Sequence, residues 1–235
     1  MSSKSSNDRK DIKDLINEDD EFKSRLEYEM RDKNRLETFV DGVFAIAITL
    51  LVLEFVVPIL PHSNAAILTY LNSLWIKFLG YFLAFFLLGI LLNNHNRQFR
   101  NLEYADQKLW WLNIIFLSFV VLVPFVTSIW IEYWDTTIGV LFFHFDMFIS
   151  GLLLCLIWVY IQKKKYLLRK GTTSKTIRVI NYRNLSFPLA SLIAIIIALF
   201  SPILSNVAYL LILLFLGRTI ELHFLPSWKK IFDKY

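Results

Sequence analysis

The sequence has 235 residues, of which 56% are hydrophobic and 16% aromatic, and its formal net charge is +5 at pH 7. So high an apolar content is typical of an integral membrane protein. The single cysteine, Cys155, lies in an apolar run, which excludes an intrachain disulfide framework or a cysteine metal cluster and indicates a small core residue. The basic residues flank apolar segments, which favours a membrane surface over nucleic acid as their partner.

Residues 1–34 form a strongly polar segment in which a few apolar residues recur at roughly helical spacing. We predict a partly helical soluble extension with a disordered tip, and no signal peptide, because no short apolar segment with a cleavage site opens the chain. The predicted organisation is therefore a cytoplasmic polar segment over 1–34, a transmembrane domain over 35–225 and a cytoplasmic tail over 226–235.

Six apolar segments follow the polar segment, and each is long enough to cross a bilayer as a helix. They are residues 37–57, 70–94, 109–131, 136–161, 185–200 and 204–222. The fold class predicted from them is an all-α integral membrane protein with six transmembrane helices.

The connections between these segments alternate in charge. Residues 58–69, 132–135 and 201–203 contain no lysine or arginine, and every basic residue except Lys77 lies in the remaining connections or the ends of the chain. By the positive-inside rule, this pattern predicts a multi-pass protein of the cell membrane with both termini in the cytoplasm.

The first apolar segment carries polar groups that a lipid-facing helix does not need, namely Asp41, Thr49 and Glu54. On a helix, Ile46, Leu50 and Leu53 fall on one narrow stripe with Thr49 at its edge, and Asp41 points about 140° away from Ile46. Such a stripe suits the lumen of a pore, but the same spacing also occurs in ordinary helix packing. Glu54 fits either a cation-concentrating group at a pore mouth or a solvated terminal charge.

Several familiar functional motifs are absent from the sequence. It has no Thr-Val-Gly-Tyr-Gly filter, no helix with arginine at every third position, no Walker-type loop and no His-Glu-x-x-His. These absences argue against an ordinary filter-type or voltage-gated channel, an ATPase and a zinc protease, and no enzymatic activity is expected.

The start of the first apolar segment resembles the signature of the transmembrane protein 175 family, in its bacterial branch of six-span subunits. The family motif is an arginine, three further residues, then Phe-Ser-Asp; Arg35, Phe39 and Asp41 match it, and Val40 takes the serine position. The detailed match covers about twenty residues, and the six-span layout agrees over the rest of the chain.

The resemblance implies a potassium-selective channel that assembles as a homotetramer in the bilayer, with the first helix of each subunit lining the pore. Ile46, Leu50 and Leu53 would then form apolar constrictions that exclude water until they widen. Thr49 would offer a hydroxyl ring as a transient contact for potassium. Potassium is the permeant ion, and no organic cofactor is expected.

Arg35 and Asp41 are six residues apart and do not form an i, i+4 pair, so each needs a partner elsewhere. His95 and Asn113 lie at a similar depth and are the expected donors to Asp41, forming with Arg35 and Phe39 a motif and gating network. An equally good interpretation makes His95 an interfacial surface histidine.

The alternative function, from a different class, is a proton-coupled secondary transporter of a small cation. It would use His144 and Asp146, which lie at membrane depth in the fourth apolar segment. These residues are two apart and point to different faces of a helix, so structural hydrogen bonds are the favoured interpretation.

Overall fold

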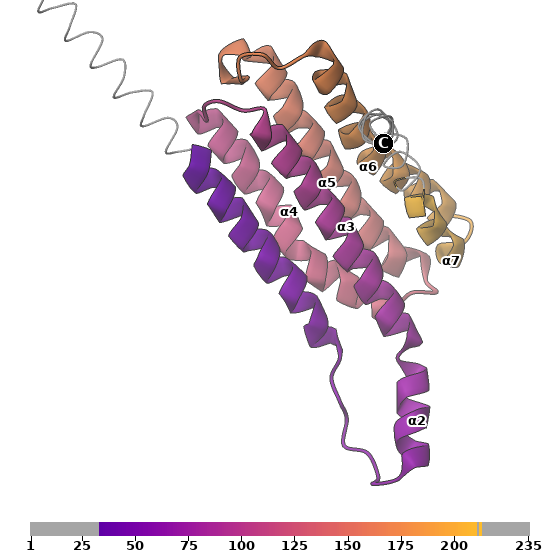
Figure 1. Ribbon diagram of the computed structural model, residues 1–235. Coiled ribbons are helices and arrows are strands. Elements are labelled where there is room, and N and C mark those ends of the chain that lie inside the picture. Colours follow the sequence, from indigo (N-terminus) through magenta and orange to yellow (C-terminus); the bar gives the residue numbers. More distant parts are fainter. Residues whose placement is uncertain (1–32, 211, 213–235) are drawn as a thin grey trace, which may run out of the picture.

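The computed structural model describes residues 33–210 and 212, and within this part of the chain the secondary structure is helical. The predictions for residues 1–32 and for the tail over 226–235 lie outside the described residues. The long helices pack side by side as a bundle (Figure 1). They are a first helix at Lys33–Glu54, whose last turn is the 3-10 segment η1 (Leu51–Glu54), then α3 (Trp75–Arg100), α4 (Gln107–Glu132), α5 (Thr137–Lys163) and α6 (Ser174–Ala198).

These five helices are long and apolar enough to cross a membrane, which agrees with the predicted fold class. The predicted sixth span, residues 204–222, lies largely outside the described residues. Its start is seen as two short helical turns, α7 (Pro202–Ser205) and η3 (Asn206–Tyr209), which pack against α6.

The starts of the fifth and second spans differ most from the prediction, because the fifth helix begins in polar sequence and the second begins after a break at Leu74. The fifth span begins at Ser174 rather than at 185, since the Thr173 side chain accepts a hydrogen bond from Thr176 N and caps the helix there. The second span begins at Trp75 rather than at 70. The residues before it form a separate short helix, α2 (Asn64–Ser73), capped by Ser63.

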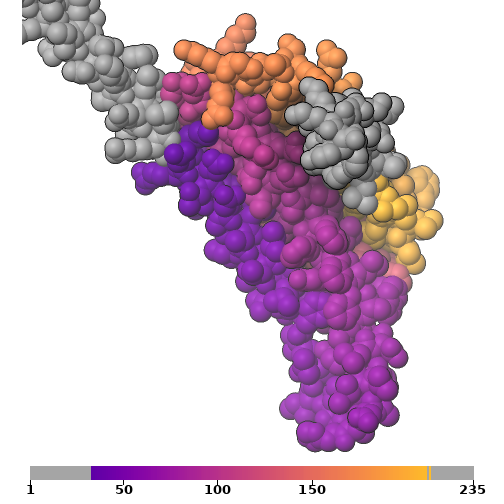
Figure 2. Space-filling view, in the orientation of Figure 1, coloured from indigo at the N-terminus to yellow at the C-terminus, as the bar shows by residue number. Residues whose placement is uncertain are grey.

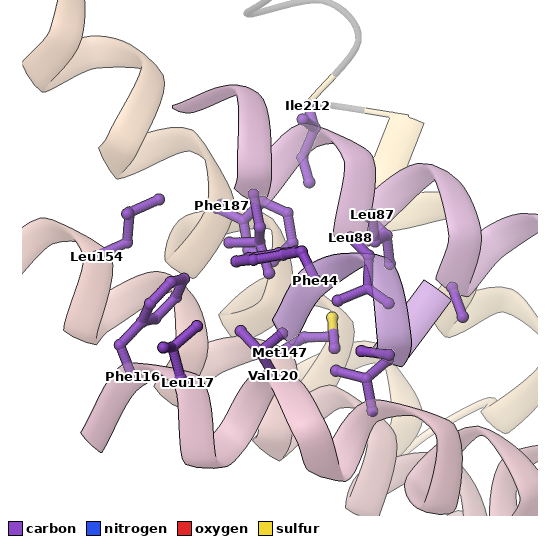
Figure 3. Packing of buried hydrophobic residues seen from close by; sticks show 14 of the residues in the cluster. Phe44, Leu87, Leu88, Phe116, Leu117, Val120, Met147, Leu154, Phe187 and Ile212 are labelled. Atoms are coloured by element: carbon purple, nitrogen blue, oxygen red, sulfur yellow. The ribbon is translucent and has the colours of Figure 1, made fainter. Parts of the chain in front are cut away.

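The core lies between α3, α4, α5 and α6, and α5 is central because it packs against both α4 and α6. Figure 3 shows buried side chains of this core. Phe44 of the first helix reaches into the same core, with its ring centroid 5.9 Å from that of Phe116 on α4. The large buried side chains of this core include Phe44, Leu88, Phe116, Val120, Met147, Leu154 and Phe187.

A glycine permits a close approach between α5 and α6. A Cβ atom placed on Gly151 would lie 2.9 Å from the backbone nitrogen of Pro188, which is closer than real Cβ contacts come. Small residues let membrane helices pack backbone to backbone, so Gly151 determines how near the two helices can lie.

The two loops at one end of the bundle are joined to each other. Leu102, after α3, forms an antiparallel bridge with Leu168, after α5. The bridge is completed by Glu103 N donating to Leu167 O at 2.7 Å and by Arg169 N donating to Asn101 O at 2.9 Å. These bonds connect the end of α3 to the segment that leads into α6.

At the opposite end, α2 and the loop before it extend beyond the bundle as a separate lobe (Figures 1 and 2). Figure 2 also shows the first helix along one side of the molecule. The first helix therefore has one face against the bundle and another that nothing in the described chain covers.

Candidate functional site

The buried face of the first helix anchors it to the rest of the protein. Its members recur every three or four residues, as expected for one face of a helix. They are Leu36, Val40, Phe44, Ala47 and Leu51, and all are buried. Val40, which stands at the serine position of the family motif, therefore takes part in packing.

The other face of the first helix carries the predicted pore residues. Ile46 is 60% exposed, Leu50 38% and Leu53 65%. Thr49 is exposed beside them. The predicted stripe is therefore not used for packing within the subunit, which removes the ordinary-packing interpretation for contacts inside the described chain.

The Thr49 hydroxyl is oriented by its own helix. Its Oγ1 donates to the carbonyl oxygen of Ile46 at 2.9 Å, one turn earlier. Because the hydroxyl proton is used in this bond, the lone pairs of Oγ1 remain on the exposed side. An oxygen in this state can accept a hydrogen bond from water or contact a cation, but it cannot donate to an anion.

At the end of the first helix, Glu54 is tied to two neighbouring helices. Ser128 Oγ of α4 donates to Glu54 Oε1 in a short hydrogen bond, and Lys77 Nζ of α3 donates to the backbone oxygen of Glu54 at 3.1 Å. Glu54 is half-buried. Glu54 is therefore neither a freely solvated charge nor a fully exposed group at a pore mouth. Its partner Ser128 is 74 residues away, and no local sequence signal points to it.

At the other end of the helix, the motif residues are arranged on its outer side. Arg35 and Asp41 are exposed, and the ring of Phe39 stacks against Trp110 of α4 with centroids 6.2 Å apart. Within the described residues Asp41 accepts no hydrogen bond, although it lies within electrostatic reach of His95. Trp110 is a contact that sequence spacing does not reveal.

The structure brings His95 and Asn113 together behind the first helix. His95 is completely buried, so the interpretation as a surface histidine is wrong. Its Nε2 lies 2.7 Å from Asn113 Oδ1, and Asn113 Nδ2 donates to Leu109 O at 2.8 Å. Because the amide nitrogen is already used, Nε2 of His95 is the donor to Oδ1 and carries the ring proton.

His95 also links this hydrogen bond to the packing of the first helix. Its ring stacks on Phe99 at 4.2 Å between centroids and lies parallel to Phe116 at 5.8 Å. Phe116 in turn contacts Phe44 of the first helix. A single buried cluster therefore joins α3, α4 and the helix that carries the exposed stripe.

A second polar cluster joins α5 to the segment after α6. His144 Nδ1 lies 2.9 Å from the hydroxyl of Tyr209, and its Nε2 lies 2.7 Å from Ser205 Oγ. Ser205 Oγ donates to Pro202 O, so Nε2 of His144 donates to Ser205 and Nδ1 accepts from Tyr209. Asp146 is buried but does not bond to His144, and no group of three metal-ligating side chains occurs in the described part.

These features define a multi-pass α-helical membrane protein with one helix face left open. A family model described as "Endosomal/lysosomal potassium channel TMEM175" matches residues 35–124. The crystal structure of a lysosomal potassium-selective channel TMEM175 homolog from Chamaesiphon minutus superposes with a TM-score of 0.68 at 26% identity, over 80% of this chain and 98% of the other. The chain is thus similar to the TMEM175 family over residues 35–124, the part that begins with its first segment, and it shares the fold of the solved homolog.

The matched relatives carry two kinds of name. A potassium channel of Streptomyces collinus is 36% identical over 104 residues, which are 44% of this chain and 50% of the relative. A potassium channel of Chamaesiphon minutus is 38% identical over 108 residues, 45% of this chain and 52% of the relative. The human relative, 31% identical over 100 residues, 40% of this chain and 20% of its own length, is named an endosomal/lysosomal proton channel. The match spans about half the length of the bacterial relatives.

Proposed function

We propose that the chain is the subunit of a potassium-selective channel that conducts passively through a pore lined by the first helices of four copies. The observation that carries this proposal is the open face of the first helix, with Ile46, Leu50 and Leu53 exposed opposite its buried face. This helix is the least buried of the five described spans. Bacterial relatives named potassium channels support the same function.

The polar groups on the open side of the helix argue against burial in lipid. Arg35, Asp41 and Thr49 are all exposed in the single subunit. A charged side chain that faces hydrocarbon is costly, and such groups normally face a bundle interior or a water-filled cavity. Contact with a second subunit would supply a protein interior, and a pore would supply a water-filled cavity. The homotetramer expected for the family would give each copy both of these environments.

The mechanism differs from carbonyl coordination. Four copies of Ile46, Leu50 or Leu53 around a pore present only aliphatic side chains, which cannot replace the hydration shell of an ion. A narrow constriction of this kind therefore blocks ions by excluding water and must widen to conduct. Potassium is larger and more weakly hydrated than sodium, and partial dehydration costs it less. Four Thr49 oxygens with their lone pairs free would stabilise a partly dehydrated cation at this level.

The proposed topology places the polar 1–34 segment, the joined α3–α4 and α5–α6 loops and the tail in the cytoplasm of a cell-membrane protein. Lys163, Lys165 and Arg169 lie at this end of the bundle. The proposed channel domain covers 35–225. Potassium is the only small partner that conduction requires, and the proposal includes no organic cofactor and no enzymatic step.

The alternative is a proton-coupled transporter that uses His144 and Asp146 at membrane depth. In the described chain, however, His144 uses both ring nitrogens in hydrogen bonds to hydroxyl groups and has no bond to Asp146.

The proposal is tested with the full-length protein in liposomes. Potassium flux should follow the potassium gradient without a proton gradient, and bi-ionic reversal potentials should favour potassium over both sodium and protons. Leu50→Ala replaces a large side chain with a small one and so widens the proposed constriction, which should raise flux several-fold. Leu122→Ala, at an exposed leucine of α4, is the matched control and should not change flux.

A potassium flux that requires a proton gradient and saturates with potassium would reject the channel and support the proton-coupled transporter. Reversal potentials that follow protons would retain the pore but reject potassium as its ion. Equal responses to Leu50→Ala and Leu122→Ala would remove the first helix from the pathway.

A further inference from the structure

A small pocket lies between the end of α3 and the first turns of α6. Figure 1 shows these helix ends at the end of the bundle remote from α2. Its volume is about 190 Å³. It is lined by Arg97, Arg100, Asn101, Thr176, Val179 and Ile180. The pocket belongs neither to the exposed stripe of the first helix nor to the His144 cluster.

The charges at this pocket are positive. Arg97 lies within electrostatic reach of Arg100, and Arg183 of α6 lies within reach of Arg97. Within the described chain, no carboxylate forms an ion pair with Arg97 or Arg100. The mutual repulsion of these guanidinium groups would be relieved by an anion in the pocket.

The donors at the pocket are only partly used. Nε of Arg97 is buried and has no hydrogen-bond partner among the described residues. Nε of Arg100 reaches the carbonyl oxygen of Asn96 at 3.5 Å, the long limit for such a bond. Two guanidinium forks on one wall match the paired oxygens of a phosphate group, which Arg binds with two parallel hydrogen bonds.

The walls of the pocket are held in place by the loops. Asn101 Nδ2 donates to the backbone oxygen of Arg97 at 2.8 Å, and Asn101 O accepts from Arg169 N. Across the pocket, the Thr176 hydroxyl lies 3.0 Å from that of Thr173, the capping residue of α6. The basic groups are therefore presented by a fixed helix end and not by a free loop.

We propose that this pocket binds the phosphate group of an anionic membrane phospholipid. Arg100 is the last residue of a spanning helix and Thr176 lies in the first turn of another, so the pocket opens where the bilayer surface meets the protein. Val179 and Ile180 supply a buried apolar wall for the lipid beside its phosphate. Basic pockets between membrane helices are known to hold acidic lipid head groups.

The proposal does not depend on ion conduction and is tested by lipid binding. The purified full-length protein is titrated in detergent with phosphatidylglycerol, with phosphatidylcholine and with inorganic phosphate. Retained lipid is measured by native mass spectrometry. We expect binding of phosphatidylglycerol to exceed that of phosphatidylcholine. Arg97→Gln with Arg100→Gln should weaken it about fivefold per removed charge, or about 25-fold together.

A matched control removes two charges from the same end of the molecule but away from the pocket. Lys165→Gln with Lys170→Gln should leave the preference for phosphatidylglycerol within about twofold of the wild type. Arg97→Lys with Arg100→Lys keeps the charge but removes the paired donors, so it should give an intermediate loss and also covers the case in which the glutamine variant fails to fold.

Three results would overturn the proposal. An equal loss of phosphatidylglycerol binding in the Arg97→Gln, Arg100→Gln variant and in the Lys165→Gln, Lys170→Gln variant would indicate a diffuse attraction to the basic surface. An unchanged preference in both arginine pairs would exclude the pocket. Binding of inorganic phosphate that displaces phosphatidylglycerol at equal concentration would show a site for a free anion.

Discussion

The hydrogen bond between His95 and Asn113 should be a measurable part of the stability of the helix bundle. Replacing Asn113 with leucine leaves the Nε2–H of His95 buried without its acceptor, and such a group costs about 1–3 kcal/mol. His95→Phe keeps a ring between Phe99 and Phe116 but leaves Asn113 Oδ1 without its donor. Each single variant should therefore unfold more easily than the wild type.

The double variant separates the hydrogen bond from packing. Coupling energies of side-chain hydrogen bonds inside membrane proteins average about 0.6 kcal/mol and reach about 1.7 kcal/mol. We expect about 1–1.5 kcal/mol here, because both groups are completely buried and the two atoms are 2.7 Å apart. The double variant should accordingly lose less stability than the sum of the singles.

The assay is reversible unfolding of the full chain in mixed micelles, followed by tryptophan fluorescence. Asn93→Leu on the exposed side of α3 serves as a control for the change of side chain, and it should cost less than 0.5 kcal/mol. Strict additivity of His95→Phe and Asn113→Leu would refute the reasoning, because it would mean that the two groups do not stabilise each other.

Three further predictions concern other parts of the chain. Thr49→Val removes the exposed oxygen while keeping the shape of the side chain, and it should lower the potassium-to-sodium permeability ratio several-fold; unchanged bi-ionic reversal potentials would reject a role for the hydroxyl. Gly151→Leu should destabilise the bundle by more than 2 kcal/mol or prevent folding, because its side chain would meet Pro188, whereas Gly42→Leu has no neighbour to displace within the subunit and should be tolerated there. Burial alone would raise the pKa of Asp106, but hydrogen bonds from Tyr160, Leu109 N and Tyr166 outweigh it and lower the pKa. The stabilisation from this carboxylate is present above its unfolded pKa near 4 and is lost as the pH falls below that value. The difference in stability between the wild type and Asp106→Asn should therefore shrink in acid, and a difference that is constant from pH 6 to pH 3 would contradict this assignment.

The helical class and the resemblance to the TMEM175 family could be predicted from the sequence because both depend on local features. An apolar run of about twenty residues specifies a spanning helix wherever it occurs, and the motif at Arg35, Phe39 and Asp41 is contiguous. The start of α6 at Ser174 could not be found in this way, because its first turns are polar and the Thr173 cap, not hydropathy, sets the boundary.

The candidate site was predictable in its periodicity but not in its partners. Helical geometry places Ile46, Leu50 and Leu53 on one stripe whatever surrounds them, and the structure leaves that stripe exposed. The hydrogen bond from Ser128 to Glu54 joins residues far apart in the chain, so it follows from how α4 packs and not from any local pattern. The sequence predicts His95 and Asn113 as donors to Asp41, whereas in the described residues they bond to each other and Asp41 accepts no hydrogen bond.

The winding of the last turn of the first helix affects how its leucines line up. In a 3-10 turn, side chains three residues apart eclipse, whereas in an α-helix they are offset by about 60°. Because η1 covers Leu51–Glu54, Leu53 stands almost directly beyond Leu50 along the axis. Rewinding this one turn as an α-helix would swing Leu53 sideways while the rest of the first helix stayed in place, so the alignment of these two exposed leucines depends on the winding of four residues.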